Sequence, residues 1–164
     1  MTMPRDPELG SQKGPMSVAI EATTPLTARA QFEQLVACFN EIKQDGFQLA
    51  SDGEYAEVLQ SIEDHKYLTN EKIPFEISMD QALFSWYENV YHPVMQAIDQ
   101  TGLVYAFPEA TRGELFMWVT RHWHFLKMER GADLGVLEAA YSFGDQFGSG
   151  LLARLVNRVK ALAA

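Results

Sequence analysis

The sequence has one cysteine and no long apolar run, and each scarcity excludes a class of protein. Cys38 has no partner in its own chain, so an internal disulfide is impossible and a reducing compartment is the simplest location. No apolar stretch approaches the roughly 18 residues that a membrane-spanning helix needs. The first residues also lack the basic and then apolar regions of a secretion signal. We therefore expect a cytoplasmic protein.

Motifs of common enzyme chemistries are absent too. The sequence contains no G-x-S-x-G nucleophile elbow, no P-loop and no G-x-G-x-x-G fingerprint. A zinc site of the C-x-x-C type needs more than one cysteine, and Cys38 has no histidine near it in the sequence. These absences favour a protein that is not an enzyme.

Acidic residues outnumber basic ones, and the imbalance is uneven along the chain. The whole chain carries a net charge of −9, whereas residues 26–147 alone hold 19 acidic and 8 basic residues. Residues 148–164 contain Arg154, Arg158 and Lys160 and no acidic residue. An acidic body repels phosphate backbones, so direct nucleic-acid binding is not expected. The basic segment could contact an anionic membrane surface or a partner, but packing on the acidic body is favoured.

An internal repeat with an offset of 57 residues is the most informative feature that is present. Residues 57–68 align without gaps on residues 114–125. The register continues through the pairs Ile77/Leu134, Gln81/Glu138, Ala82/Ala139, Phe84/Tyr141 and Trp86/Phe143. Each copy, about 57–91 and 114–148, has the pattern of helix, loop and helix, and a helical hairpin cannot bury its apolar stripe alone. No segment alternates like a strand. We therefore predict an all-α fold of duplicated helical hairpins, packed as a single bundle of five to seven helices.

Local signals predict where the helices begin. A serine or threonine followed three residues later by Glu or Gln forms a capping box, and the sequence has three, at 51–54, 78–81 and 111–114. Before them, apolar periodicity predicts a helix from residue 27 to about residue 44. Residues 1–25 contain several prolines and glycines and little periodicity, which predicts a disordered tail.

Glycine and proline predict where helices end. Gly102 and Gly131 should end two of them, and residues 103–110 form a turn-rich connector. Pro93 removes a backbone donor, so its helix should kink or restart at the preceding residue. Residues 148–164 are expected to be a hinge followed by an amphipathic helix.

Three segments carry the most distinctive residues. Residues 65–67 have the pattern H-x-Y, residues 86–93 read W-Y-E-N-V-Y-H-P, and a Phe-Pro pair at 107–108 leads into an aromatic helix that ends in histidine. Over about residues 51–147 the chain resembles a bacterial helical module of unknown function. In longer proteins this module follows a ParB-like domain, and some of those proteins are labelled transcriptional regulators. The resemblance implies a helical fold and, as one alternative, a DNA-associated regulator that acts with a partner.

Two histidines, His65 and His122, lie at equivalent positions on the apolar sides of their helices. If the two hairpins pack about a two-fold axis, the rings could meet and bind a metal ion or small ligand, with His124, Glu71 or Glu129 as further ligands. The alternative is a core histidine whose ring bonds a backbone carbonyl or a carboxylate across its hairpin. No E-x-x-H spacing occurs on these helices, so the core role is favoured.

Aromatic and cationic residues form two clusters, and such residues are frequent at interaction hot spots. The clusters are Trp86, Tyr87, Tyr91 and His92, and Trp118, Arg121 and Trp123. The same residues could instead fill a core, with the tyrosine hydroxyls bonding carbonyls freed by the proline. The leading hypothesis is a non-enzymatic regulatory or accessory module that acts through protein–protein contacts or self-association. A metal- or ligand-binding bundle and a DNA-associated regulator are the alternatives.

Overall fold

The structure is a computed structural model, and it describes residues 25–148. These residues are helical and contain no strand, as the sequence predicts. The elements are α1 (Ala28–Leu35), α2 (Asn40–Gln44), α3 (Asp52–Asn70), α4 (Met79–Trp86), the π-helical turn η1 (Tyr87–Tyr91), α5 (His92–Thr101), α6 (Leu103–Ala106), α7 (Arg112–Arg130) and α8 (Val136–Phe147). Because α4, η1 and α5 are continuous, the described residues form seven helices. The predicted tail, except residue 25, and the predicted C-terminal hinge and helix beyond residue 148 lie outside this range.

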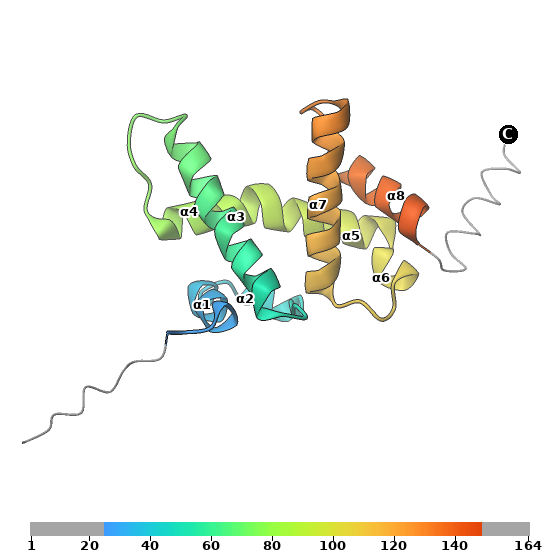
Figure 1. Cartoon of the computed structure of the whole chain (residues 1–164), viewed down its shortest axis with the longest axis horizontal. Coiled ribbons are helices and arrows are strands. Elements are labelled where there is room, and N and C mark those ends of the chain that lie inside the picture. The colour runs from blue at the N-terminus through green and yellow to red at the C-terminus, as the bar shows by residue number, and fades with distance from the viewer. Residues whose placement is uncertain (1–24, 149–164) are drawn as a thin grey trace, which may run out of the picture.

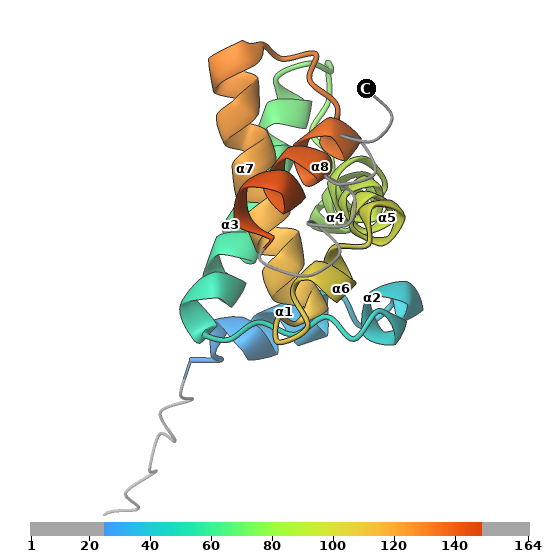
Figure 2. The same ribbon diagram turned by 90° about the vertical axis from the view of Figure 1, so that its right-hand side faces the viewer.

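The long helix α4–η1–α5 supports the other elements. Figure 1 shows it running across the molecule behind α3 and α7. The helix α3 packs on its α4 half, whereas α7 and α8 pack on its α5 half. The helix α1 packs against α3, and Figure 2 shows α1 and α2 together at one end of the bundle. Hairpin 1 (α3–α4) therefore includes the first part of the long helix, whereas hairpin 2 (α7–α8) packs on its α5 part.

The local signals for helix ends are confirmed. In each of the three capping boxes, at 51–54, 78–81 and 111–114, the hydroxyl accepts from the third helical N–H and the Glu or Gln side chain accepts from the capping N–H. Gly102 and Gly131 follow the last residues of α5 and α7 with φ angles of 69° and 117°. These signals act within a few residues, so the rest of the fold cannot override them easily.

The predicted helix from residue 27 to residue 44 is wrong, because the chain turns between α1 and α2. Residues 36–39 leave the helix, and Phe39 is extended with φ −95° and ψ 93°. Val36 and Ile42 would lie about 120° apart around a continuous helix. The turn lets both of them enter the same core, where they are 3% and 2% exposed.

Residues 103–110, predicted as a turn-rich connector, contain the one-turn helix α6. Its Leu103 is buried against α8, so close that a Cβ on Gly144 would lie 3.1 Å from Leu103 Cδ2. One turn is too short to show helical periodicity in a sequence, and tertiary packing decides its conformation.

Pro93 is the second residue of α5, and the helix widens into a π-turn just before it. A proline ring crowds the carbonyl four residues earlier, and the wider turn separates the two groups. The sequence predicts a kink or a restart near His92, and the hydrogen bonding does change there from π- to α-helical, but the helix continues without a break. The predicted bond from a tyrosine hydroxyl to a freed carbonyl is wrong for Tyr91, whose hydroxyl donates to Asp45 Oδ2 at 3.0 Å.

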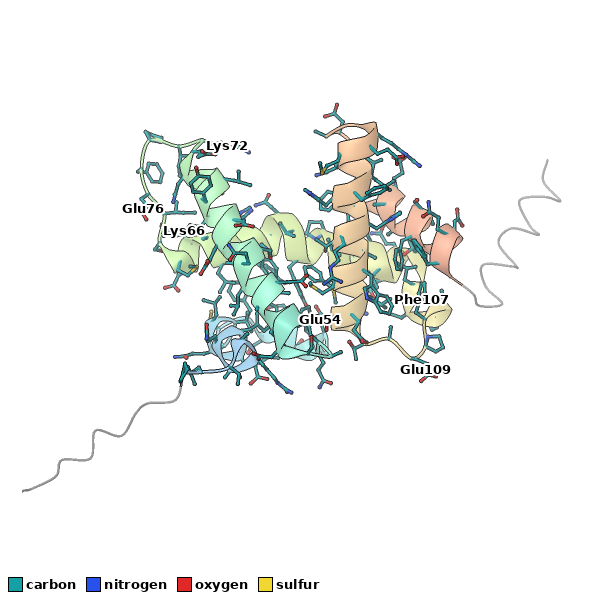
Figure 3. All side chains as sticks on the ribbon, in the orientation of Figure 1. Glu54, Lys66, Lys72, Glu76, Phe107 and Glu109 are labelled. Carbon is teal, nitrogen blue, oxygen red and sulfur yellow. The ribbon has the colours of Figure 1, made fainter. Side chains whose placement is uncertain are left out.

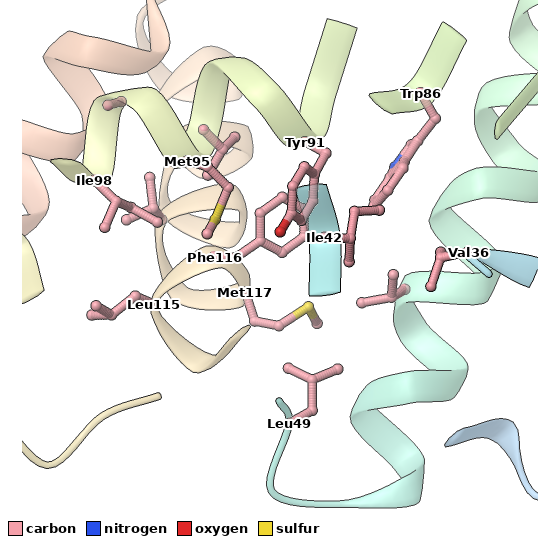
Figure 4. Packing of buried hydrophobic residues seen from close by; sticks show 14 of the residues in the cluster. Val36, Ile42, Leu49, Trp86, Tyr91, Met95, Ile98, Leu115, Phe116 and Met117 are labelled. Atoms are coloured by element: carbon pink, nitrogen blue, oxygen red, sulfur yellow. The ribbon is translucent and has the colours of Figure 1, made fainter. Parts of the chain in front are cut away.

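Aromatic rings fill the centre of the core and join its two halves. Trp86 and Tyr91 of the long helix meet Phe116 of α7, with ring centroids 5.9 Å and 5.4 Å from the Phe116 ring. Figure 4 shows these three side chains together with Ile42 of α2. Phe47 of the connector between α2 and α3 completes the cluster, 5.7 Å from Phe116. Elements from both ends of the described chain therefore share one core.

The connector between α2 and α3 lies directly on the first turn of α7. A Cβ on Gly113 would be 2.1 Å from the carbonyl oxygen of Gln48. That oxygen also accepts a hydrogen bond of 2.6 Å from Thr111 Oγ1. Gly53 holds the same position in the first capping box, but a Cβ there would meet only Ser51 Oγ, at 3.8 Å. The chain thus contains a matched pair of glycines, of which only Gly113 is required by packing.

We expect Gly113→Ala to lower the free energy of unfolding by about 2 kcal/mol, because the methyl group would displace the backbone of Gln48. Gly53→Ala should leave the free energy of unfolding unchanged or raise it by about 0.5 kcal/mol, since alanine favours a helix where space is free. Urea denaturation of both variants measures the difference. Equal effects of the two substitutions would show that the close approach at Gly113 does not hold the fold.

Candidate interaction surface

The two repeat-related histidines make equivalent hydrogen bonds. His65 Nε2 lies 2.8 Å from Ser85 Oγ, and His122 Nε2 lies 3.0 Å from Ser142 Oγ. The two serines are also 57 residues apart, so the two repeats share this side-chain contact as well as their sequence pattern. The predicted bond across each hairpin is confirmed, but its partner is a serine hydroxyl and not a carbonyl or a carboxylate.

Both histidine rings favour the neutral form. Burial lowers the pKa of His65, and the charge of Lys72 lowers it further. Burial likewise lowers the pKa of His122, with a smaller effect from Arg130. A neutral imidazole can either donate to a hydroxyl or accept from it, which suits the bond to serine. The two rings therefore act as uncharged links between the helices of each hairpin.

The structure places the candidate metal ligands apart. His65 and His122 belong to different hairpins, and each is bonded to the serine of its own hairpin. His124, Glu71 and Glu129 are exposed. Among residues 25–148, no three histidine, cysteine or acidic side chains gather closely enough to hold a metal ion.

The first predicted interaction cluster lies largely inside the molecule. Trp86 and Tyr91 are each 1% exposed, so a partner cannot reach them. Tyr87 is half-buried, and its ring stacks on the exposed His92 with centroids 6.0 Å apart. Burial raises the pKa of Tyr91, and the adjacent Asp45 carboxylate raises it further. Tyr91 is thus a neutral core residue that donates to Asp45.

The second predicted cluster mostly joins elements of the chain itself. Trp118 is partly buried against the core. Trp123 Nε1 donates to the carbonyl of Leu134 at 2.8 Å, which links α7 to the loop that precedes α8. Arg121 forms an ion pair of 2.5 Å with Glu57 and so links α7 to α3. Trp118 and Trp123 are therefore partly buried within the chain, and Arg121 is the exposed member of this cluster, with 48% of its side chain exposed.

The large apolar side chains that do face solvent include four at equivalent positions of the two repeats. Leu68 and Phe125 are 52% and 60% exposed, and Phe84 and Tyr141 are 58% and 54% exposed. Both pairs are 57 residues apart. The alignment of the repeats contained these pairs, but apolar residues in a helical stripe are ordinarily assigned to the buried side. Their exposure is decided by how the helices pack, which the sequence pattern does not show.

Hairpin 1 combines exposed apolar side chains with an excess of acidic ones. We define the hairpin 1 surface by its apolar side chains that are more than half exposed, which are Tyr67, Leu68, Phe75 and Phe84. They come from the end of α3, the following loop and α4, at one end of the molecule (Figure 1). Residues 52–86 of hairpin 1 hold eight acidic and two basic residues, whereas residues 112–147 of hairpin 2 hold five acidic and four basic residues.

The basic residues of hairpin 1 do little to offset its acidity. Figure 3 shows Lys66, Lys72 and Glu76 together near the end of the hairpin. The ammonium of Lys66 lies 3.1 Å from the Glu76 carboxylate, so one of the two positive charges is already paired within the chain. The hairpin 1 surface therefore consists of apolar side chains on a hairpin whose net charge is negative.

Comparisons of the chain with protein-family models, with curated proteins and with solved structures find no match. The fold defines the class, an all-α bundle of two related helical hairpins in which the second helix of hairpin 1 continues into α5 and hairpin 2 packs on α5. None of the helices in the described range is long and apolar enough to cross a membrane.

Acidification should weaken the fold through His65 and His122. Because folding lowers the pKa of both rings, the unfolded chain binds more protons as the pH falls below the ordinary histidine value of 6.5. The stability that the neutral rings contribute is present above this pH and lost as the pH falls through it. Between about pH 7.5 and about pH 5.5, wild type should therefore lose more stability than the double variant His65→Gln, His122→Gln.

Urea denaturation at both pH values measures this loss. Glutamine keeps an amide that can bond the serine but carries no titrating group. His124→Gln, on an exposed position of the same helix α7, is the control and should behave like wild type. An identical pH dependence in wild type and in the double variant would contradict the assignment.

Proposed function

We propose that this protein is a non-enzymatic helical module that binds another protein through the hairpin 1 surface. The observation that supports it is the exposure of large apolar side chains at the same positions of both repeats, Leu68/Phe125 and Phe84/Tyr141. Large apolar side chains exposed to solvent are typical of interaction sites, and aromatic residues are enriched among those that contribute most to binding there. A regulatory or accessory role in the bacterial cytoplasm fits such a module.

The acidity of hairpin 1 indicates the character of the partner. Eight acidic residues against two basic ones in 52–86 attract a positively charged surface and repel an acidic one. A protein with a basic rim around an apolar centre satisfies both features. The same charge repels phosphate groups, so any role at DNA requires a partner that supplies the phosphate contacts.

The double variant Leu68→Ser, Phe84→Ser should lower the affinity for the partner by about tenfold or more, since it removes two apolar contacts. The matched control is Phe125→Ser, Tyr141→Ser, the equivalent change in hairpin 2, which should keep binding. The partner is isolated on the tagged full chain from its own host, identified by mass spectrometry, and its affinity is then measured with purified proteins.

All four positions are exposed, so circular dichroism should show unchanged helix content in both variants. Equal losses of affinity in the two variants, or none in either, would contradict the proposal. If light scattering instead shows a homodimer that only the hairpin 1 variant dissociates, the partner is a second copy of this chain.

A further inference from the structure

The outer face of α8 carries an acidic and aromatic row. Glu138, Tyr141 and Asp145 are spaced by three and four residues, which places them on one side of the helix, and all three are exposed. None of the ion pairs formed within residues 25–148 involves either carboxylate. Phe147, at the last turn of the same helix, is 54% exposed. This face offers both apolar area and negative charge.

The sequence that follows α8 has the complementary chemistry. Residues 149–164 contain three basic residues and no acidic one. Leu151, Leu155 and Val159 are spaced by four residues, a pattern that predicts an apolar stripe, and Arg154 and Arg158 come next to that stripe. The described chain ends at Gly148, immediately after α8, so this segment starts beside the face that it complements.

We propose that residues 149–164 dock on the outer face of α8 of the same chain. The glycines at 148 and 150 allow a reversal of direction at the end of α8. In an antiparallel arrangement Arg154 comes level with Asp145, and Arg158 comes level with Tyr141, because each pair is equally far from the reversal. The segment 151–163 is about as long as α8, which has 12 residues, so it can cover the whole face.

Two arguments favour this occupant over an external one. A segment joined to α8 by a few residues is held at an effective concentration of about the millimolar range, which a free partner rarely reaches. The equivalent helix of hairpin 1 is followed by η1 and α5, and not by a basic segment. The docking therefore explains how the two repeats differ, with hairpin 2 covered by its own chain and hairpin 1 left open.

Disulfide mapping in the full chain tests the docking. In a Cys38→Ser background, the pair Tyr141→Cys, Val159→Cys should close an intrachain disulfide under mild oxidation and leave both arginines in place. The matched control replaces Phe84, the repeat equivalent of Tyr141, in the pair Phe84→Cys, Val159→Cys. We expect the first disulfide to form at least about tenfold faster than the second, because docking raises the effective concentration at α8 alone.

Charge reversal tests the proposed ionic contacts. Arg154→Glu with Arg158→Glu should slow the 141–159 disulfide several-fold, and adding Glu138→Lys with Asp145→Lys should restore its rate. All changes on α8 are at exposed positions, so circular dichroism should show unchanged helix content in these variants. Restoration by the opposite charges shows that the loss was not due to unfolding.

Each other outcome overturns the proposal. A disulfide that links two chains means that the segment docks on a second copy. Faster closure at position 84 than at position 141 means that it docks on hairpin 1. Equal rates at both positions mean that residues 149–164 do not dock on α8.

Discussion

The close approach of the Gln48 backbone to Gly113 is the constraint on which the bundle depends. A Cβ at Gly113 would lie 2.1 Å from the Gln48 carbonyl oxygen, so no side chain fits there, and the Thr111 hydroxyl donates a hydrogen bond to the same oxygen. Next to this contact, Phe47 enters the aromatic cluster around Phe116. The loop at residues 45–51 therefore joins the first two helices of the described chain to hairpin 2, and the shared core forms around that junction.

A polar network reinforces this junction. Arg112, beside Gly113, donates to both carboxylate oxygens of Asp99 at 2.7 Å and 3.1 Å and lies 3.9 Å from Asp45. The hydroxyl of Tyr91 donates to Asp45 from the other side. Because the guanidinium is about a quarter exposed, its ion pairs gain part of their strength from partial burial and lose part to solvent. The network links α2, η1, α5 and α7 at the edge of the aromatic cluster.

The duplicated hairpins keep the interactions that build a hairpin and differ in those that face outwards. Val58 and Leu115, Ile62 and Val119, and Ala82 and Ala139 are buried pairs, each 1% exposed or less. The histidine–serine bonds recur as well. The outer surfaces have diverged, since hairpin 1 is strongly acidic and hairpin 2 is nearly neutral. Arg121 takes the place that Asp64 has in the first repeat, and it pairs with Glu57 of that repeat, so divergence has also joined the two hairpins.

The sequence by itself determined the all-α class, the repeat with its register and most helix ends, because capping boxes, glycines and a 3.6-residue period act between neighbours along the chain. It did not determine the turn after α1, the short helix α6 or which aromatic residues are buried. Trp86 and Phe84 stand two residues apart, yet one is 1% and the other 58% exposed. Only the tertiary structure decided this, because burial depends on which helix faces meet, and that is set by contacts such as Gln48 with Gly113, 65 residues apart in the chain.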